Sequence, residues 1–226
     1  MTTVFDKEER CFVCGSTNSY AAIASTNRAG SPDLDTRPPE KMRSTLSFWI
    51  RRCARCGYCA PDTSRGPLKP EAIRGIVDSD VYRRQENDAS FPALANRFLC
   101  WSMVQEASGN YPEAGWTALH AAWTCDDAEA VDAARDCRRR AIALLRIAQA
   151  TGMEFSQNPS NEAAILADLL RRSSLFDEVL EACKEGLAAN PSQVVRKVLL
   201  FQIELAGRQD SRRYTVTDAV ISVTQQ

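Results

Sequence analysis

The stretches Cys11-Phe12-Val13-Cys14-Gly15 and Cys53-Ala54-Arg55-Cys56-Gly57 decide how the front of this chain folds. In each, two residues separate a pair of cysteines, and glycine follows the second cysteine. A spacer of two residues lets a tight turn direct both sulfurs at one ion, and glycine allows the left-handed backbone that such a turn needs. Two of these knuckles make a tetrahedral site without an open position. We therefore predict one structural Zn²⁺, bound by Cys11, Cys14, Cys53 and Cys56.

The two knuckles are separated by 38 residues, more than in most zinc ribbons. Residues 20–25 and 45–52 have strand propensity, and the second segment leads directly into Cys53. Residues 30–40 contain three prolines and two aspartates, which favour an extended loop rich in turns. Because closure entropy rises slowly with loop length, this insertion is tolerable. Residues 1–66 are thus predicted to form a small zinc-ribbon-like β module.

Other cysteines and acids near the knuckles leave alternatives open. Cys59 continues the spacing Cys53-x-x-Cys56-x-x-Cys59 and competes as a ligand. A redox pair of the thioredoxin type also uses C-x-x-C, but it expects a helix start rather than a glycine knuckle. Asp33 and Asp35 suit a second, harder metal ion, although aspartates in such a loop more often form turns.

After residue 66 the sequence becomes rich in Ala, Leu and Arg at helical spacing. Residues 66–70 have the composition of a linker. Residues 67–208 are predicted to form helical hairpins, with helices over 92–107, 112–124, 128–150, 159–172, 175–189 and 191–206. Gly109 and Gly152 are expected to end the first and third of these. The tail, residues 209–226, has strand propensity at 214–217 and 220–223, or is frayed.

Two stretches match the tetratricopeptide pattern of paired helices. One runs from Ser174 to Pro191, preceded by apolar residues of a first helix, and the other begins Gly109-Asn110-Tyr111-Pro112-Glu113-Ala114. Val179, Cys183 and Ala118 depart from the residue types usual at their positions. A plain helical bundle is the alternative. The predicted fold class is therefore mainly α: a Cys₄ zinc-ribbon-like β module followed by a tetratricopeptide-like helical repeat domain.

The chain resembles an uncharacterised bacterial family, a domain of unknown function that joins a zinc-ribbon-like front to helical repeats. The resemblance is carried by the two knuckles, the loop 30–40, Met42-Arg43-Ser44-Thr45, Cys56-Gly57-Tyr58 and Gly115-Trp116-Thr117-Ala118-Leu119-His120-Ala121-Ala122-Trp123. It implies a cytoplasmic metal-binding protein and assigns no reaction.

Composition limits the function classes. With 44% hydrophobic residues, 25% charged residues and a net charge of −1, the chain has a core but no strong attraction to nucleic acid or membrane. No apolar run is long enough for a membrane helix, and residues 1–10 do not form a secretory signal. Nine cysteines, mostly without a pairing pattern, favour a reducing cytoplasm.

Catalysis has little support in the sequence. His120 is the single histidine, and no Gly-rich phosphate loop or histidine metal motif is present. We therefore expect a non-enzymatic adaptor whose helical groove binds a protein or peptide. Inward-facing candidates for partner binding are Gln105, His120 and Trp123. Arg135, Arg138, Arg139 and Arg146 form a second candidate, an anchor for an acidic partner segment.

Nucleic-acid binding is the alternative function. Arg51, Arg52 and Arg55 lie among Phe48, Trp49 and Tyr58, a mixture of basic and aromatic residues that suits stacking on bases. On a strand, however, Phe48 and Trp49 would face opposite sides, so some of these rings would only cover the knuckles.

Overall fold

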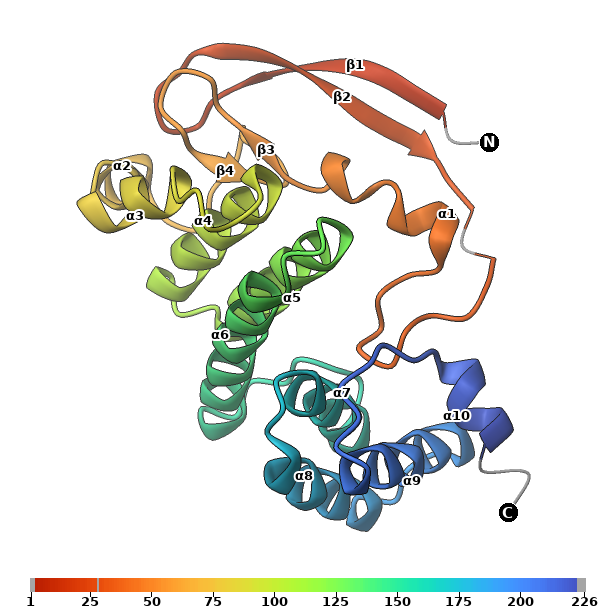
Figure 1. Ribbon diagram of the computed structural model, residues 1–226. Coiled ribbons are helices and arrows are strands. Elements are labelled where there is room, and N and C mark those ends of the chain that lie inside the picture. Colours follow the sequence, from red (N-terminus) through yellow and green to blue (C-terminus); the bar gives the residue numbers. More distant parts are fainter. Residues whose placement is uncertain (1–2, 28, 223–226) are drawn as a thin grey trace.

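The front of the computed structural model, which describes residues 3–27 and 29–222, is a long β-hairpin that arches over the helices (Figure 1). Strand β1 (Thr3–Arg10) pairs antiparallel with β2 (Thr17–Ser25), in register from Val4 opposite Ile23 to Arg10 opposite Thr17. The first cysteine knuckle forms the turn between them. The predicted strand over residues 20–25 is confirmed. The sequence reading missed β1, whose Asp-Lys-Glu-Glu-Arg run lacks strand propensity.

The predicted strand over residues 45–52 is wrong for most of its length. The 3-10 helix η1 (Leu46–Phe48) occupies the start, and only β3 (Arg51–Arg52) is extended, paired with β4 (Cys59–Ala60). Leu46 and Ile50 are both buried, a spacing of four that suits a helical turn rather than a strand. The Trp49 indole also donates to the Thr45 hydroxyl at 3.0 Å, which stabilises this turn.

Short helices occupy places that were predicted as loop or linker. Helix α1 (Glu40–Arg43) ends the loop 30–40, and α2 (Pro70–Val77) begins directly at the end of the expected linker. Proline at the first helical position lacks the amide that would otherwise be unsatisfied there. Ile73 and Val77 are buried at a spacing of four, so α2 packs on one face. Helix α3 (Asp80–Glu86) follows, capped by the Ser79 hydroxyl.

Six longer helices follow α3 in the described part of the chain, and all six were predicted, with ends that differ by a few residues. They are α4 (Ala93–Ala107), α5 (Tyr111–Asp127), α6 (Val131–Ala150), α7 (Pro159–Arg172), α8 (Phe176–Ala188) and α9 (Gln193–Gly207). Each of these helices packs against the next one along the chain, and the connection between α6 and α7 is longer than the others (Figure 1). Gly109 and Gly152 end α4 and α6 at φ of 79° and 73°, as expected. The hairpins are present, whereas their tetratricopeptide type stays a prediction.

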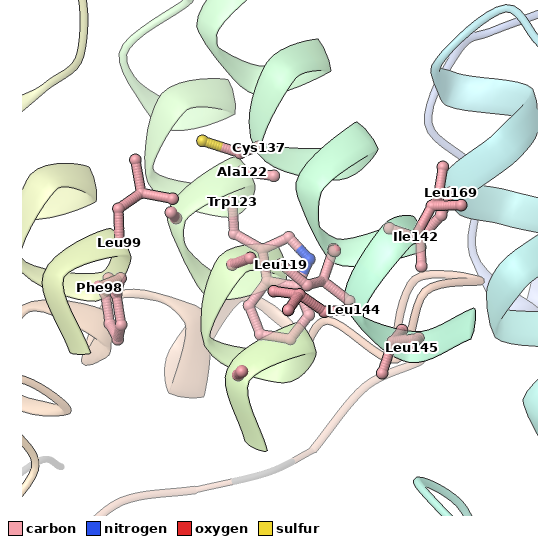
Figure 2. Close-up of a cluster of buried hydrophobic side chains, with 14 of the residues drawn as sticks. Phe98, Leu99, Leu119, Ala122, Trp123, Cys137, Ile142, Leu144, Leu145 and Leu169 are labelled. Carbon is pink, nitrogen blue, oxygen red and sulfur yellow. The ribbon is translucent and has the colours of Figure 1, made fainter. Parts of the chain in front are cut away.

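The hydrophobic core runs through α4, α5, α6 and α7. Phe98 and Leu99 from α4 face Leu119 from α5, and Leu145 and Leu169 continue the cluster through α6 and α7 (Figure 2). Helices α5 and α6 approach closely at Gly115, where an added Cβ would lie 2.6 Å from the Leu145 side chain. Glycine inside this helix is therefore a packing requirement. No helix within residues 3–27 and 29–222 combines the length and apolar composition that a bilayer crossing requires.

The C-terminal segment is helical rather than a strand. Helix α10 (Val216–Ser222) covers most of the segment predicted as strands at 214–217 and 220–223, and residue 223 lies outside the described part. Ala219 is buried, and α10 packs on α9. One β-bridge remains, between Asp33 and Thr215. The Leu34 amide donates to the Tyr214 carbonyl at 3.0 Å, so the segment before α10 pairs with the loop 30–40.

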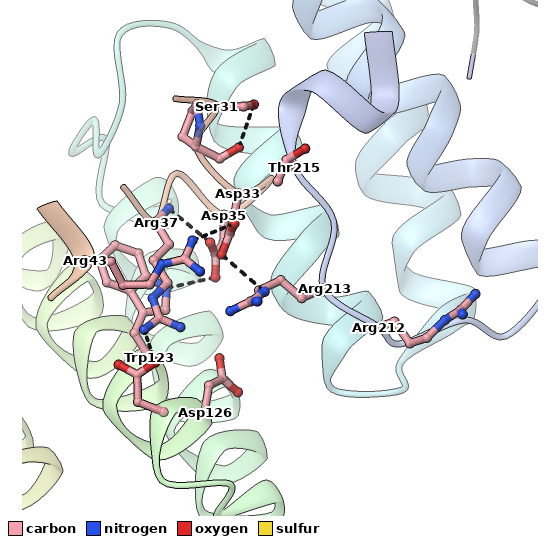
Figure 3. Close-up of polar contacts among 12 residues, drawn as sticks. Ser31, Asp33, Asp35, Arg37, Arg43, Trp123, Asp126, Arg212, Arg213 and Thr215 are labelled. Carbon is pink, nitrogen blue, oxygen red and sulfur yellow. Dashed lines mark hydrogen bonds and ion pairs between the residues drawn. The ribbon is translucent and has the colours of Figure 1, made fainter. Parts of the chain in front are cut away.

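The loop 30–40 is an ordered polar junction, which we call the clasp and define as residues 32–37 with Trp123, Arg172 and residues 214–216 (Figure 3). Asp35 is fully buried; one of its carboxylate oxygens accepts from the Trp123 indole at 2.8 Å and from Arg172 at 3.3 Å. Its other oxygen accepts from the Arg37 amide, which closes a turn. The turn interpretation of Asp33 and Asp35 is thus confirmed.

Replacing Asp35 should destabilise the whole fold. Asp35→Ala removes the carboxylate that the buried Arg172 and Trp123 side chains contact. Breaking a buried ion pair in this way lowers the free energy of unfolding by about 3 kcal/mol or more. Chemical denaturation at neutral pH measures the loss. Asp132→Ala, which removes an exposed carboxylate paired with Arg135, should change stability by no more than about 0.5 kcal/mol. Equal effects of the two substitutions would contradict the role given to the clasp.

Candidate metal centre

The four knuckle cysteines meet at one point. Their sulfurs all lie within 4.8 Å of one another, with 3.7 Å between Cys11 and Cys56 and 3.6 Å between Cys14 and Cys53. A tetrahedron of sulfurs at about 2.3 Å from a central ion has edges of about 3.8 Å. The predicted ligands are therefore brought together, and the four cysteines could hold a metal ion. Because the set supplies four thiolates, a tetrahedral ion would have no position left for water or substrate.

The backbone explains why the sulfurs converge. In the first knuckle the Gly15 amide donates to the Cys11 carbonyl at 2.8 Å, and in the second the Gly57 amide donates to the Cys53 carbonyl at 3.0 Å. The two glycines have φ of 72° and 79°, in the left-handed region that a side chain disfavours. Each turn thus folds its two cysteines onto the same side, as the doubled sequence pattern predicted.

Polar groups outside the four ligands contact the sulfurs. The Ser16 hydroxyl lies 3.1 Å from the Cys14 sulfur and 3.2 Å from the Cys53 sulfur, and the Asn18 amide is 3.6 Å from the latter. Burial raises the pKa of the Cys53 thiol, but the Ser16 hydroxyl and the knuckle amides outweigh it and lower that pKa to about 6. Burial raises the pKa of Cys56. Ser16 and Asn18 were missed by the sequence reading, although both follow the first knuckle within four residues.

The second knuckle is attached to helix α3. The Tyr82 hydroxyl donates to the Gly57 carbonyl at 3.0 Å and accepts from the Cys59 amide at 3.1 Å. Glu86 accepts from the Arg52 guanidinium at 2.7 Å, and an added Cβ on Gly57 would collide with the Glu86 carboxylate. Gly57 is thus required both for its backbone angle and for this close approach, which couples the metal centre to the helices.

Cys59 does not join the four-sulfur cluster. Within the described part of the chain its thiol donates to the Gly57 carbonyl at 3.4 Å. Cys59 is buried, and its strand β4 packs against α4. It therefore supports the turn rather than competing for the ion.

The candidates for an inward-facing groove are mostly unavailable to a partner. Gln105 is 4% exposed and Trp123 is 2% exposed, and the Trp123 indole is bound to Asp35. This corrects the prediction that these two residues line an open groove. Both lie on buried helix faces, which helical spacing alone does not distinguish from a binding face.

His120 lies among four aromatic rings. Its ring centroid is 4.8 Å from that of Trp123, 5.3 Å from Trp49, 5.6 Å from Phe98 and 6.5 Å from Trp116. Burial lowers the pKa of His120 to about 4, although the Asp35 carboxylate acts in the opposite direction. A neutral imidazole in this environment serves as a packing group that joins η1 to α4 and α5.

The arginines of α6 do not form one surface. Arg135 is half-buried near the start of the helix, Arg138 is buried and pairs with Asp126, and Arg139 is exposed. Arg146, near the other end, pairs with Glu178 of α8 at 2.6 Å. The predicted anchor is thus divided between the two ends of α6.

The basic and aromatic residues before the second knuckle are largely engaged. Arg51 pairs with the buried Glu9, and Arg52 pairs with Glu86. Trp49 packs on His120. The charges of Arg51 and Arg52 are therefore partly neutralised within the fold.

Comparisons with protein-family models, with curated proteins and with solved structures find no match for this chain. The resemblance drawn from the sequence therefore stays a prediction, and the function must be argued from the described residues.

Purified protein should contain one metal ion per chain. Cys11→Ser and Cys56→Ser each remove a thiolate from different knuckles and should lose that ion together with the folded signal of the front module, since metal binding and folding are coupled in such sites. Elemental analysis and circular dichroism measure both effects. Cys183→Ser, a substitution of a buried thiol far along the chain, serves as the control that keeps the metal. Protein without metal that remains folded would contradict this assignment.

Acid should destabilise the protein partly through His120. The pKa of His120 in the folded chain is about 4, below the ordinary value of 6.5, so the unfolded chain binds a proton here more readily than the folded chain does. The contribution of His120 to the free energy of unfolding is therefore complete above pH 6.5 and is lost as the pH falls toward 4. Between pH 7 and 4.5 this amounts to about 2 kcal/mol. In His120→Gln the free energy of unfolding should depend less on pH by that amount. Both proteins carry the same cysteines, so acid release of metal cancels in the comparison, and identical pH profiles would contradict the prediction.

Proposed function

We propose that this chain is a non-enzymatic zinc-binding adaptor whose helices α6, α7 and α8 bind a basic segment of a partner protein. The observation that carries the proposal is an acidic groove between these helices, with a volume of about 480 Å³. The four-cysteine cluster supports the zinc part, because a set of four thiolates suits Zn²⁺ and a closed site holds structure rather than performing chemistry.

The groove combines an apolar floor with an acidic wall. Leu166 and Leu170 of α7 form the floor, and Arg146 and Gln149 of α6 form one side. The wall is a set of carboxylates on α8: Asp177, Glu178, Glu181 and Glu185. Positions 177, 181 and 185 recur every four residues, so these three carboxylates share one face of the helix. Such a surface complements a segment in which lysine or arginine alternates with apolar residues.

The carboxylates of the wall could exchange their present ion-pair partners for cations of a bound segment. The Arg146–Glu178 pair joins side chains that are both about half exposed, and Lys184 lies 3.9 Å from Glu181. Exposed ion pairs contribute only about 0–1 kcal/mol, so a cation from a partner can replace them at little cost. Arg146, which the sequence predicted to bind a partner, lies at the rim of this groove and would release Glu178 to the partner.

The absence of an open coordination position and the surroundings of His120 support a non-enzymatic role. His120, the single histidine of the sequence, packs among four aromatic rings. Its lowered pKa makes it a poor proton acceptor near neutral pH.

A second candidate is nucleic-acid binding, favoured by a hollow of about 370 Å³ beside the second knuckle. Arg51, Arg52 and Arg97 line it together with Tyr20 and Phe48, and the residues lining it include no carboxylate. Salt-sensitive binding of single-stranded DNA that is lost in Arg97→Glu would favour this function over the adaptor.

The adaptor proposal predicts binding of a basic peptide. A short fluorescein-labelled peptide of alternating lysine and leucine should bind the zinc-loaded protein, whereas one of alternating glutamate and leucine should not. The double substitution Glu181→Lys and Glu185→Lys should weaken binding by about tenfold or more, because it reverses two charges on the wall. Fluorescence anisotropy measures the affinity.

The matched control is Asp136→Lys, which reverses an exposed charge on α6 outside the groove. Equal affinity of the groove variant and the unsubstituted protein, or an equal loss in Asp136→Lys, would show that the peptide binds elsewhere or through net charge alone.

A further inference from the structure

Five arginines surround a second cavity at the opposite end of α6 from the acidic groove. The cavity has a volume of about 310 Å³ and lies between the end of α5, the first turns of α6, the end of α7 and residues 211–213. Its lining includes Arg135, Arg138, Arg172, Arg212 and Arg213, against the carboxylates of Asp126 and Glu129. A concentration of guanidinium groups of this kind favours an anion.

The floor of the cavity is built from buried charges. The Arg138 side chain is 3% exposed and pairs with Asp126, which also accepts from Arg172 at 2.9 Å. Burial would raise the pKa of Asp126, but the two arginines outweigh it and lower that pKa, so Asp126 stays ionised near neutral pH. The Arg138 Nε is buried and, among the described residues, has no hydrogen-bond acceptor. A buried donor without an acceptor costs free energy, so the Arg138 guanidinium is not fully satisfied within the fold.

The rim of the cavity has donors that are free to meet a ligand. Arg213 is 48% exposed and its nearest carboxylate, Asp33, is 3.9 Å away, too far for a hydrogen bond. Figure 3 shows the Arg213 side chain directed toward the clasp and that of Arg212 directed away from it. Arg135 makes one contact of 3.3 Å, with the exposed Asp132. Arg212 is already paired with Asp210, so it contributes less to the cavity than Arg135 and Arg213 do.

We propose that this cavity binds a phosphate dianion, either inorganic phosphate or the phosphoryl group of a small phosphate monoester. The lining holds five arginines and two carboxylates, but Arg172 and Arg212 are also paired with Asp35 and Asp210. Arg135 and Arg213, which have the weakest contacts, therefore supply the charge that favours a multiply charged anion. A phosphoryl group offers three acceptor oxygens, and Arg135 of α6 and Arg213 of the segment before α10 line the cavity from different elements. The volume suits a small molecule.

Such a ligand would stabilise the clasp. Arg172 contacts both Asp35 and Asp126, and Arg213 lies next to Asp33, so an anion held by these arginines would join α6 and α7 to the segment before α10. A ligand that binds only the folded chain raises its stability by mass action.

Titration calorimetry of the zinc-loaded full chain with inorganic phosphate tests the site. Phosphate should bind in a saturable manner at constant ionic strength, and acetate should not. Arg135→Gln and Arg213→Gln should each weaken binding by about tenfold, because each removes a charge-assisted donor. Arg139→Gln changes an exposed arginine of the same helix outside the cavity and should bind as the unsubstituted protein does.

Phenyl phosphate distinguishes the two sources of the anion. Tighter binding than inorganic phosphate supports a monoester site, and equal or weaker binding supports inorganic phosphate. Acetate binding as tight as phosphate binding, an equal loss in Arg139→Gln, or no loss in Arg135→Gln and Arg213→Gln would overturn the proposal. Unchanged metal content and unfolding midpoints of the variants without phosphate show that the fold is kept. The peptide-binding groove is at the other end of α6, so this test stands apart from the adaptor proposal.

Discussion

The buried carboxylate of Asp35 is the constraint on which the rest of the structure depends. Removing a carboxylate from water is costly unless its oxygens are paired, and here they accept from Trp123 of α5, Arg172 of α7 and the amide of Arg37. Trp123 and Arg172 lie 88 and 137 residues from Asp35 in the sequence. The pairing is therefore satisfied only when the loop 30–40 and the two helices have reached their places together, which ties the front module to the helical hairpins.

The metal centre and the clasp act on the same long excursion between the knuckles. The four cysteines hold its two ends within a few ångströms, and the clasp holds its middle against the helices. Tyr82 and Glu86 then attach the second knuckle to α3. Because the four-cysteine cluster and the clasp hold the same excursion, a change that loosens one of them is expected to weaken the other.

The sequence was informative where local chemistry determines the structure. The cysteine knuckles and the six long helices are set by short-range spacing, proline and glycine, so they were predictable. The failures arise where distant contacts decide. The charged strand β1 forms because β2 is beside it, residues 45–52 turn because Leu46 and Ile50 are both buried, and Trp123 is buried because Asp35 accepts its N–H. Neither the clasp nor the cavity lined by Arg213 could be predicted, since their residues lie far apart in the chain.

A net charge of −1 conceals a strong separation of charge along α6. The carboxylates of α8 face one end of this helix, and the arginines of α6, α7 and the C-terminal segment gather at the other. Each end of α6 therefore presents its own charge to a ligand. The sequence reading treated Arg135 and Arg146 as members of one anchor because they share a helix. In the fold they belong to surfaces of opposite character, since it is the neighbouring helices that determine what each arginine meets.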